Sequence, residues 1–303
     1  MNSKQSGRAN ERGDHPSGTW STAPWPRTPR DPVAFWQAMN HPSYPLSNAY
    51  DPAWLFANSM GPVCLWLAEE IVPKLDLKPG QRILDLGCGR AATSIFLARE
   101  FGVEVVAADL WIDAEENRQR ITEAGVSQLV TPAQAGANRL PFDHQSFDAV
   151  VSFDAYHYFG TEMRYLSYLS QFVKPGGRIG VLVPGNSIDP DEPHAEPLTL
   201  DLSDTLGADW FTFRSAEWWR RHWSRTPGIA IESAQMVDAG HANFMRYVTA
   251  WEAFIGQPAA EQDNGKMLLS KAGNTLGFVR LVARRTDDRK MYFGLGEFEH
   301  RIA

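Results

Sequence analysis

The stretch that decides the fold is ILDLGCGRAA, which occupies residues 83–92. It opens with an apolar run that contains one acid, Asp85, and a short apolar run before glycines is typical of a buried strand. Gly87 and Gly89 then form a turn, and the following residues predict a helix as far as Phe101. Glycine lacks a Cβ atom, so this backbone can touch a ligand, and the start of the helix offers free N–H groups. We therefore expect a ligand at this turn, which requires open space above the two glycines.

An acidic residue stands at the expected distance from the turn. Asp109 lies 20 residues after Gly89, at the end of a second predicted strand, Val103–Ala108. A carboxylate in that place can accept both hydroxyls of a ribose. The turn also satisfies the G-x-G-x-x-A pattern of dinucleotide-binding proteins, so a nicotinamide-dependent dehydrogenase is an alternative, and an ordinary turn without a ligand is another. Asp85 argues against a pyrophosphate, because its charge would repel phosphate and attract an ammonium group.

Outward from this segment, strands and helices alternate along the chain. This alternation predicts an α/β fold, with a doubly wound, mostly parallel sheet and helices on both faces. Further strands are predicted at Phe147–Phe153, Arg178–Val183, Ile229–Val237 and Phe278–Ala283, and helices at Thr93–Phe101, Asn117–Ala124, Glu162–Val173, Ser215–Arg225 and Asn243–Phe254.

The composition divides the chain into parts. Residues 1–32 are polar and rich in proline, which predicts a disordered tail. Aromatic residues return over 33–76, which we interpret as an N-terminal helical arm or lid. Residues 77–285 form the main domain, with a helical cap inserted at about 240–273. A C-terminal tail, 286–303, is too short and mixed to assign.

The bulk composition excludes several classes of protein. The chain has 303 residues, 43% of them hydrophobic, and a formal net charge of -7. An acidic surface repels phosphate backbones, so we expect no nucleic-acid partner. The two cysteines, Cys64 and Cys88, fit neither a zinc site nor a disulfide framework. No segment is apolar and long enough for a secretion signal or a membrane span. We therefore expect a cytoplasmic protein.

Three further segments follow the glycine motif along the chain, and together they form a set of motifs in a characteristic order. LPF at 140–142 and SFDAVV at 146–151 accompany one predicted strand, and FVKPGG at 172–177 precedes the next. Together with D-x-G-x-G at 85–89 and the acid at Asp109, this set resembles the class I (Rossmann-like) S-adenosylmethionine-dependent methyltransferases. The resemblance implies a seven-stranded sheet and S-adenosyl-L-methionine as the cofactor.

The resemblance also assigns cofactor-binding residues position by position, and it places the family's third strand at Leu129–Thr131. Many members have an acid at the position of Gly136 for the adenine amino group, which leaves the backbone of Ala137 and the Asn138 side chain here. The implied cofactor-binding residues are Asp85, Gly87 and Gly89 at the methionine end, Asp109 at the ribose, Leu110, Trp111, Ala137 and Asn138 at the adenine, and Asp154 at the end of the fourth strand.

The reacting group is expected beside the segment DAYHYFG, residues 154–160. Ligands of open parallel sheets bind at the carboxyl ends of the strands, and this segment follows the strand that ends at Phe153. The resemblance implies that the segment faces the sulfonium methyl. His157 is then the candidate general base, and Tyr156 and Tyr158 can present aromatic faces to the cation. A packing or hydrogen-bonding role for His157 is the alternative.

The chain is also similar to a bacterial group of small-molecule methyltransferases named after cyclopropane-fatty-acid synthases or ubiquinone/menaquinone methylases. The shared segments are YPLSN (44–48), MGP (60–62), ADLWI (108–112), DAYHYFG (154–160) and EWWRRHW (217–223). The substrates of that group are poorly defined, so this similarity does not imply lipid chemistry.

Two other clusters have both a structural and a functional interpretation. Trp218, Trp219 and Trp223 could wall a substrate pocket, but packing of their helix against the sheet is favoured. The acids between Asp189 and Glu196 could bind a divalent cation. Their spacing matches no metal loop, and the prolines among them indicate a lid instead. We therefore predict no metal site.

These observations predict an enzyme that transfers a methyl group from S-adenosylmethionine to an O, N or C atom of a small molecule. The acceptor is expected to have an apolar or aromatic body, of the kind found in secondary metabolism. A cyclase-type enzyme that keeps the cofactor site without methylating is the first alternative, and a nicotinamide-dependent dehydrogenase is the second. We expect a small-molecule substrate as the partner and leave a homodimer open.

Overall fold

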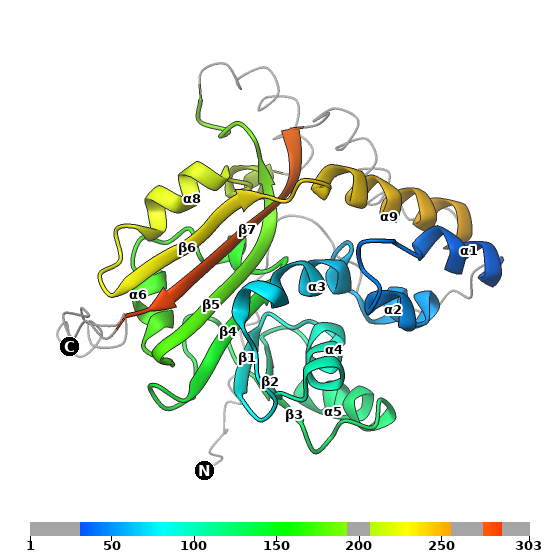
Figure 1. The fold of residues 1–303 in the computed structure, drawn as a ribbon, viewed down its shortest axis with the longest axis horizontal. Helices are drawn as coiled ribbons and strands as arrows, with labels where there is room; N and C mark the ends of the chain where they lie inside the picture. The colour runs from blue at the N-terminus through cyan, green and yellow to red at the C-terminus, as the bar shows by residue number, and fades with distance from the viewer. Residues whose placement is uncertain (1–30, 193–206, 256–274, 287–303) are drawn as a thin grey trace, which may run out of the picture.

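The structure, a computed structural model, describes residues 31–192, 207–255 and 275–286. Its centre is a seven-stranded sheet with the strand order β3-β2-β1-β4-β5-β7-β6 (Figure 1). The strands are β1 (Arg82–Leu86), β2 (Glu104–Asp109), β3 (Val130–Gln134), β4 (Phe147–Phe153), β5 (Val173–Asn186), β6 (Ile229–Met236) and β7 (Leu276–Arg285).

Most of the sheet is parallel. Strands β1 to β5 pair in parallel, whereas β7 lies antiparallel between β5 and β6. The strand order reverses between β1 and β4, where Ile83 pairs with Ala149 and Asp85 with Val151. The carboxyl ends of strands at such a reversal are where open α/β sheets bind ligands. The predicted fold class is confirmed, and the structure points to this edge as the place of the site.

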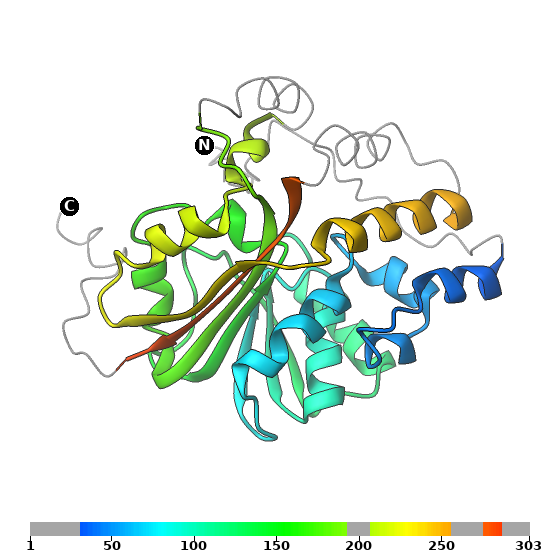
Figure 2. The same ribbon diagram turned by 45° about the horizontal axis from the view of Figure 1, so that its top comes forward.

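Helices cover both faces of the sheet. Helices α3, α4 and α5 cover one face, and α6 and α8 cover the other (Figures 1 and 2). The helices are α1 (Pro32–Met39), α2 (Pro52–Asn58), α3 (Cys64–Leu75), α4 (Ala92–Phe101), α5 (Ala114–Glu123), α6 (Tyr165–Ser170), α8 (Ala216–Trp223) and α9 (Gly240–Ile255), with short 3-10 helices η1 (Ser47–Ala49), η2 (Tyr156–Tyr158) and η4 (Gly207–Thr212).

Local capping explains where several helices begin. The side chains of Asp31, Asp51 and Asp113 accept hydrogen bonds from the first backbone N–H groups of α1, α2 and α5. Ser215 does the same for α8. These N–H groups have no partner inside the helix, so each cap satisfies a donor that would otherwise need water. The start of each of these helices is therefore set by its own local sequence.

The core on the α6/α8 face is aromatic. Trp219 and Trp223 are fully buried, and their rings lie 5.6 Å and 5.7 Å from the ring of Tyr156, measured between centroids. Trp218 is only partly buried and stacks on His222 at 4.6 Å. Large rings in edge contact are the usual way that such cores pack. The packing interpretation is therefore confirmed for Trp219 and Trp223.

Strand β5 begins earlier than the predicted Arg178–Val183. It starts at Val173, and its register with β4 shifts after Phe147. Gly176 lies in this irregular stretch with a φ of +82°, a left-handed conformation that glycine adopts most easily. An extra stretch on one strand of a pair is a bulge. The KPGG segment therefore belongs to the strand and does not form a turn before it.

The N-terminal arm and the cap insertion contact each other. Helix α1 packs against α9 (Figure 2), and Arg246 of α9 donates hydrogen bonds to the carbonyl oxygens of Ala38 (2.6 Å) and Asn40 (2.8 Å). Phe56 of α2 stacks on Tyr247 of α9 with 4.6 Å between ring centroids. Two segments far apart in sequence thus form one helical layer.

Parts of the predicted organisation lie outside the described residues. These are the tail before residue 31, the cap beyond Ile255 as far as residue 273, and the C-terminal tail beyond residue 286. Within the described ranges, none of the helices has both the length and the apolar character that a bilayer crossing requires.

Candidate functional site

The candidate site lies where β1 and β4 end, at the reversal of strand order. Both loops are tied to a neighbouring strand, because Gly87 donates its N–H to Ala108 of β2 and Asp154 donates its N–H to Leu182 of β5, each at 2.8 Å. The loops also meet, since a Cβ atom added to Gly87 would lie 2.4 Å from the Cβ of Ala155. The glycine turn and the segment 154–160 therefore lie against each other at the carboxyl edge of the sheet, where open α/β sheets form their binding crevice.

The turn needs its glycines for conformation as well as for space. Gly87 has a φ of +76° and Gly89 a φ of +54°, both in the left-handed region that L side chains rarely adopt. The predicted approach of this backbone to a ligand stays a prediction. At Gly87 the approaching neighbour is Ala155 of the same chain.

Asp109 binds the glycine turn through the backbone. Its Oδ2 accepts a hydrogen bond from the N–H of Gly89 at 2.8 Å. Its Oδ1 accepts from the N–H groups of Trp111 (2.8 Å) and Ile112 (3.0 Å). A carboxylate has about four lone pairs, so one oxygen lone pair is left on the Gly89 side. The contact between Asp109 and the turn supports the sequence interpretation, and the ribose contact stays a prediction.

Asp85 is buried with only one of its two oxygens satisfied. Its Oδ2 accepts hydrogen bonds from the hydroxyls of Thr93 (2.6 Å) and Ser94 (2.7 Å). Its Oδ1 has no hydrogen-bond partner among the described residues. Burial raises the pKa of Asp85 to about 6, although the hydrogen bonds from the two hydroxyls act in the opposite direction and lower this pKa. A cationic donor such as an ammonium would satisfy the unpaired oxygen.

Sequence reasoning missed three residues that hold the turn. Thr93 and Ser94 at the start of α4 bind Asp85, and Asn117 of α5 donates from Nδ2 to the carbonyl oxygen of Gly89 at 2.8 Å. All three are buried. Two polar residues in the otherwise apolar start of α4 were a readable signal. Asn117 gave none, because its role depends on how α5 packs beside the turn.

The residues assigned to the adenine lie together. A Cβ atom added to Gly136 would lie 3.2 Å from Oδ1 of Asn138 and 3.7 Å from Cδ1 of Leu110. The carbonyl of Ala137 accepts a hydrogen bond from the Tyr165 hydroxyl at 3.0 Å, which holds this loop to α6. Leu110 and Trp111 expose 58% and 54% of their surface. The adenine contact itself stays a prediction.

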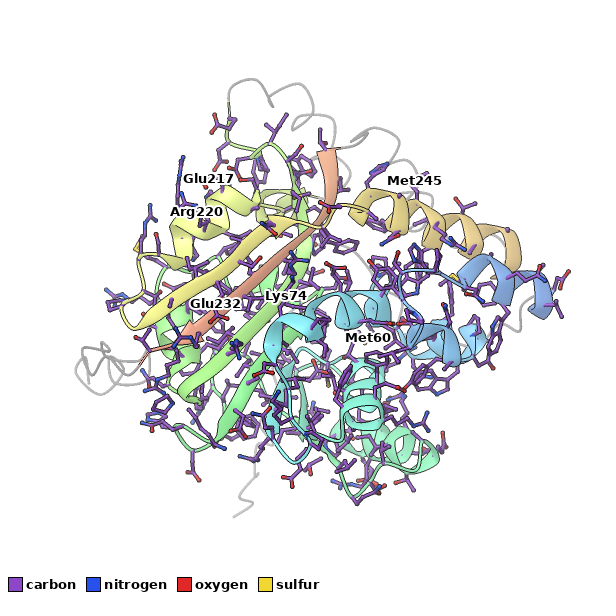
Figure 3. All side chains as sticks on the ribbon, viewed as in Figure 1. Met60, Lys74, Glu217, Arg220, Glu232 and Met245 are labelled. Carbon is purple, nitrogen blue, oxygen red and sulfur yellow. The ribbon has the colours of Figure 1, made fainter. Side chains whose placement is uncertain are left out.

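The segment between α2 and α3 covers the crevice. A Cβ atom added to Gly89 would lie 3.0 Å from Sδ of Met60, and one added to Gly61 would lie 2.0 Å from Oδ2 of Asp154. Figure 3 shows Met60 on the side of the sheet that carries α3 and α4. The expected open space above the glycines is therefore not what the structure has. We expect the Met60 side chain to shift when a cofactor binds.

His157 is placed for packing more than for proton transfer. It is 1% exposed, and its ring lies 4.0 Å from that of Tyr158 and 5.5 Å from that of Phe213, between centroids. Its Nδ1 is buried without a partner among the described residues. Burial lowers the pKa of His157 to about 3. A base this weak holds few protons near neutral pH, so the geometry favours the packing alternative.

The two tyrosines of the segment have different surroundings. Tyr156 is fully buried and packs against Trp219, Trp223 and Tyr165. It does not fit the predicted contact with the cofactor, because the core surrounds its ring. Tyr158 is 37% exposed, and its ring meets that of Trp111 edge to face at 6.1 Å. Tyr158 thus lies at the rim of the crevice, where contact with a ligand stays a prediction.

Asp154 is the third acid of the crevice. Its φ of +53° is left-handed, and its side chain has no hydrogen bond with any described residue. The side chain is partly exposed, and the neighbouring atoms that displace water from the rest of it raise the pKa of Asp154 to about 8. Strained backbone at the end of a strand is typical of functional positions.

Two other features of the described residues do not join the site. No cluster of three or more His, Cys, Asp or Glu side chains in these ranges could hold a metal ion. A hollow of about 780 Å³ lies between α1 and α9, lined by residues that include Ala38, His41, Asn243 and Arg246. None of the predicted site residues lines it.

The donor set fits S-adenosylmethionine better than a dinucleotide. The unpaired, buried Oδ1 of Asp85 suits an ammonium and would repel a pyrophosphate. Asp109 lies against the same turn and keeps a free lone pair for a hydroxyl. Exposed apolar faces stand beside Asn138 for a base.

Comparison with known proteins agrees with this geometry. Residues 83–177 match the family model of the methyltransferase domain. The chain is 24% identical over 247 residues to the 27-O-demethylrifamycin SV methyltransferase of Amycolatopsis mediterranei, a match that covers 73% of this chain and 83% of that protein.

A second relative and a solved structure extend the comparison. The chain is 28% identical over 145 residues to the glycine/sarcosine/dimethylglycine N-methyltransferase of Actinopolyspora halophila, which covers 47% of this chain but only 26% of that protein. The structure of geranyl diphosphate C-methyltransferase from Streptomyces coelicolor A3(2) superposes with a TM-score of 0.60 at 16% identity, covering 86% of each chain. At this identity the likeness concerns the fold.

Proposed function

We propose, on the premise that this chain is a class I S-adenosylmethionine-dependent methyltransferase of Rossmann-like fold, that it methylates a small-molecule acceptor. The observation that carries the proposal is the turn formed by Gly87 and Gly89, with Asp109 bonded to it and Asp85 buried beside it. This turn lies within the segment that matches the methyltransferase domain.

The chain's own residues would hold and orient the reactants. S-adenosylmethionine, when bound, supplies an electrophilic methyl group on a sulfonium. Asp85 would accept a hydrogen bond from its ammonium, and Asp109 would accept one from a ribose hydroxyl. Holding the acceptor in line with the methyl group supplies much of the rate in such a displacement. The segment with Met60 and Gly61 lies where it can close over the reactants and exclude water.

A small acceptor is supported by the relatives and by charge. The two relatives are named for a rifamycin derivative and for glycine, sarcosine and dimethylglycine, all of them small molecules. The formal net charge of -7 disfavours a nucleic-acid substrate. The proposed substrate is therefore a metabolite.

Calorimetric titration tests the cofactor. S-adenosylhomocysteine is expected to bind and NADH is not, and Asp85→Ala is expected to weaken S-adenosylhomocysteine by about tenfold or more, because it removes a charged hydrogen-bond acceptor. Binding of NADH in place of S-adenosylhomocysteine would overturn the proposal.

A metabolite screen tests the reaction. The chain, S-adenosylmethionine and a metabolite library are expected to yield S-adenosylhomocysteine and a product heavier by one methyl group. An acceptor that is converted without formation of S-adenosylhomocysteine would instead support the cyclase-type alternative.

We also propose a cytoplasmic setting for the enzyme. Cys64 and Cys88 are both free thiols in the structure, which suits a reducing compartment. Fractionation of cells that express the tagged chain checks this, and recovery outside the cytoplasm would refute it.

A further inference from the structure

The three acids of the crevice differ in how the protein satisfies them. Asp109 accepts three backbone N–H groups, and Asp85 accepts two hydroxyls on one oxygen. The carboxyl of Asp154 has no hydrogen bond with any described residue. Acids with a purely structural role are normally hydrogen-bonded when they are enclosed. Asp154 therefore differs from the other two acids, because neither of its oxygens has a hydrogen-bond partner among the described residues.

The backbone presents Asp154 at the end of β4 in a costly conformation. Its φ of +53° is in the left-handed region, where residues other than glycine are uncommon. The N–H of Asp154 donates to the carbonyl of Leu182 at 2.8 Å, which fixes the residue to β5. Such strain persists only when the surroundings hold it. Here the neighbouring strand holds the carboxyl at the mouth of the crevice.

Asp154 is surrounded by neutral groups from three other elements. The titratable groups that interact with it are the Cys64 thiol of α3, the Tyr158 hydroxyl of η2 and the Tyr247 hydroxyl of α9. Burial raises the pKa of each of them, so all three are uncharged near neutral pH. Gly61 of the arm lies over the carboxyl, and any side chain there would fill its space.

An ionised carboxyl in these surroundings lacks a counter-charge. Asp154 is partly shielded from water, and a shielded charge without a partner is unfavourable, so the group favours a proton or a cation. The pKa of about 8 for Asp154 reflects this situation.

We propose that Asp154, in place of the cofactor contact that the resemblance implies for it, is the acceptor-binding carboxylate of this enzyme and that the methyl acceptor is a primary or secondary amine with an apolar body. This inference rests on the proposed methyl transfer. The ammonium form of the acceptor pairs with Asp154, between the arm and α9. An anionic acceptor is disfavoured at this position because it would lie against an acid without a cation beside it.

The pairing also prepares the acceptor for reaction. An ammonium nitrogen has no free lone pair and cannot attack a methyl group. Asp154 in its carboxylate form takes one proton from the ammonium, which leaves the neutral amine with its lone pair and Asp154 as the neutral carboxylic acid. Charge and protons balance in this step, because the positive and negative charges are neutralised together. The proton on Asp154 passes to solvent when the product leaves.

A matched pair of probes tests the proposal. Binding of 2-phenylethylamine and 2-phenylethanol is measured at pH 8 on the chain saturated with S-adenosylhomocysteine. The amine is expected to bind about tenfold or more tightly than the alcohol, because only the amine carries a charge for Asp154. In Asp154→Asn the amine is expected to lose that advantage, while the alcohol changes by about twofold or less.

The variants are chosen so that folding does not decide the result. Asparagine tolerates the left-handed backbone nearly as well as aspartate, so Asp154→Asn is expected to fold. Asp143→Asn changes an exposed acid outside the site and is expected to leave both probes unchanged. Equal binding of amine and alcohol by the unaltered chain, or an amine preference that survives in Asp154→Asn, would overturn the proposal. So would failure of the amine to bind.

A spectroscopic measurement gives an independent readout. The carboxyl carbon of Asp154, followed by 13C NMR, is expected to titrate near pH 8 in the free chain and at lower pH with the amine bound. An unchanged titration would contradict the pairing. Binding of S-adenosylhomocysteine by the unaltered chain is the control for the proposed function: if it fails, the methyltransferase assignment fails, and if it holds while the amine preference is absent, only the inference about Asp154 fails.

Discussion

Asp109 and Asp154 stand at the carboxyl ends of β2 and β4, the two strands on either side of β1, yet they differ in their hydrogen bonds. Asp109 ends β2 and accepts three backbone N–H groups within 3.0 Å. Asp154 follows β4 and has no hydrogen bond with the described residues, and burial raises its pKa to about 8. The first acid is bonded to the protein's own backbone, and the second has no hydrogen-bond partner among the described residues.

This difference separates two parts of the crevice, which we name after their proposed roles. The cofactor half is the part around Gly87, Gly89 and Asp109, and the acceptor half is the part around Asp154. The cofactor half is held by hydrogen bonds to backbone, so its shape exists before any ligand binds. The acceptor half is covered by Met60 and Gly61 and contains an unpaired acid. Its neighbours come from the arm and from α9, which are distant in sequence. We expect the cofactor half to respond to small changes in backbone geometry and the acceptor half to respond to charge.

The largest expected effect comes from Gly87→Ala. The new methyl group would lie 2.4 Å from Cβ of Ala155, at a φ of +76°. Both strain and overlap distort the turn, so we expect S-adenosylhomocysteine to bind about 100-fold more weakly and the chain to lose roughly 1–3 kcal/mol of stability. Calorimetry and chemical denaturation measure the two effects.

Gly80→Ala is the matched control for that change. Gly80 has a φ of +79°, but a Cβ atom there would meet nothing within 4 Å. The substitution Gly80→Ala is expected to lower the free energy of unfolding by about 1 kcal/mol without changing the affinity for S-adenosylhomocysteine. Equal loss of affinity in both variants would show that backbone strain alone, and not contact at the crevice, governs the turn.

The next effect concerns Asp109→Asn. The amide keeps one oxygen for the N–H groups of Trp111 and Ile112, but its NH₂ group would face the N–H of Gly89. Two donors cannot pair, so we expect S-adenosylhomocysteine to bind about tenfold more weakly. Asp113→Asn, which keeps a good cap for α5, is expected to bind normally. Normal binding by Asp109→Asn would remove Asp109 from the cofactor half.

A third prediction uses the pH dependence of stability. The folded-state pKa of Asp154, about 8, lies above the ordinary value of 3.8. The folded chain therefore holds this proton more tightly than the unfolded chain, and stability falls as pH rises from about 4 to about 8. Asparagine cannot ionise, so Asp154→Asn is expected to gain roughly 1–3 kcal/mol at pH 8 and little near pH 4.

Denaturation with urea at pH 4 and pH 8 checks this prediction. The exposed substitution Asp143→Asn is expected to leave the pH dependence unchanged. A variant Asp154→Asn that is less stable than the unaltered chain at pH 8 would mean that Asp154 is charged and partnered in the folded state.

The smallest expected effect is that of His157→Gln. Because burial lowers the pKa of His157 to about 3, the side chain is neutral across the physiological range and accepts few protons. Once an acceptor is identified, we expect kcat/KM to change by about threefold or less, with no change in the shape of its pH profile. A loss of two orders of magnitude together with an altered profile would restore His157 as the general base.

Much of the cofactor half was readable from the sequence because its parts are close in the chain. The glycine turn and α4 follow one another, and Asp109 lies one strand-helix-strand unit further on. Periodicity within such a unit sets the pairing of β1 and β2, so the contact between Asp109 and Gly89 follows from local order. The aromatic packing of Trp219 and Trp223 was likewise favoured from their helix.

The sequence did not predict which side chains of the segment 154–160 are buried and which are exposed. Alternation along a short turn does not say which ring faces the core. Tyr156 points into the core against α8, whereas Tyr158 reaches the rim. The pKa of His157 depends on rings brought from Phe213 and Tyr158, and no sequence spacing carries that information.

By itself the sequence determined the fold class, the cofactor class and the position of the glycine turn, because these depend on short-range periodicity and on residues without side chains at a turn. Only the tertiary structure decided that Met60 and Gly61 cover the crevice and that Asp154 stands without a partner. The physical reason is that burial and unmet hydrogen bonds are properties of the whole packed chain. They arise when Gly61 of the arm and Tyr247 of α9 come close to Asp154, and no single stretch of residues contains them.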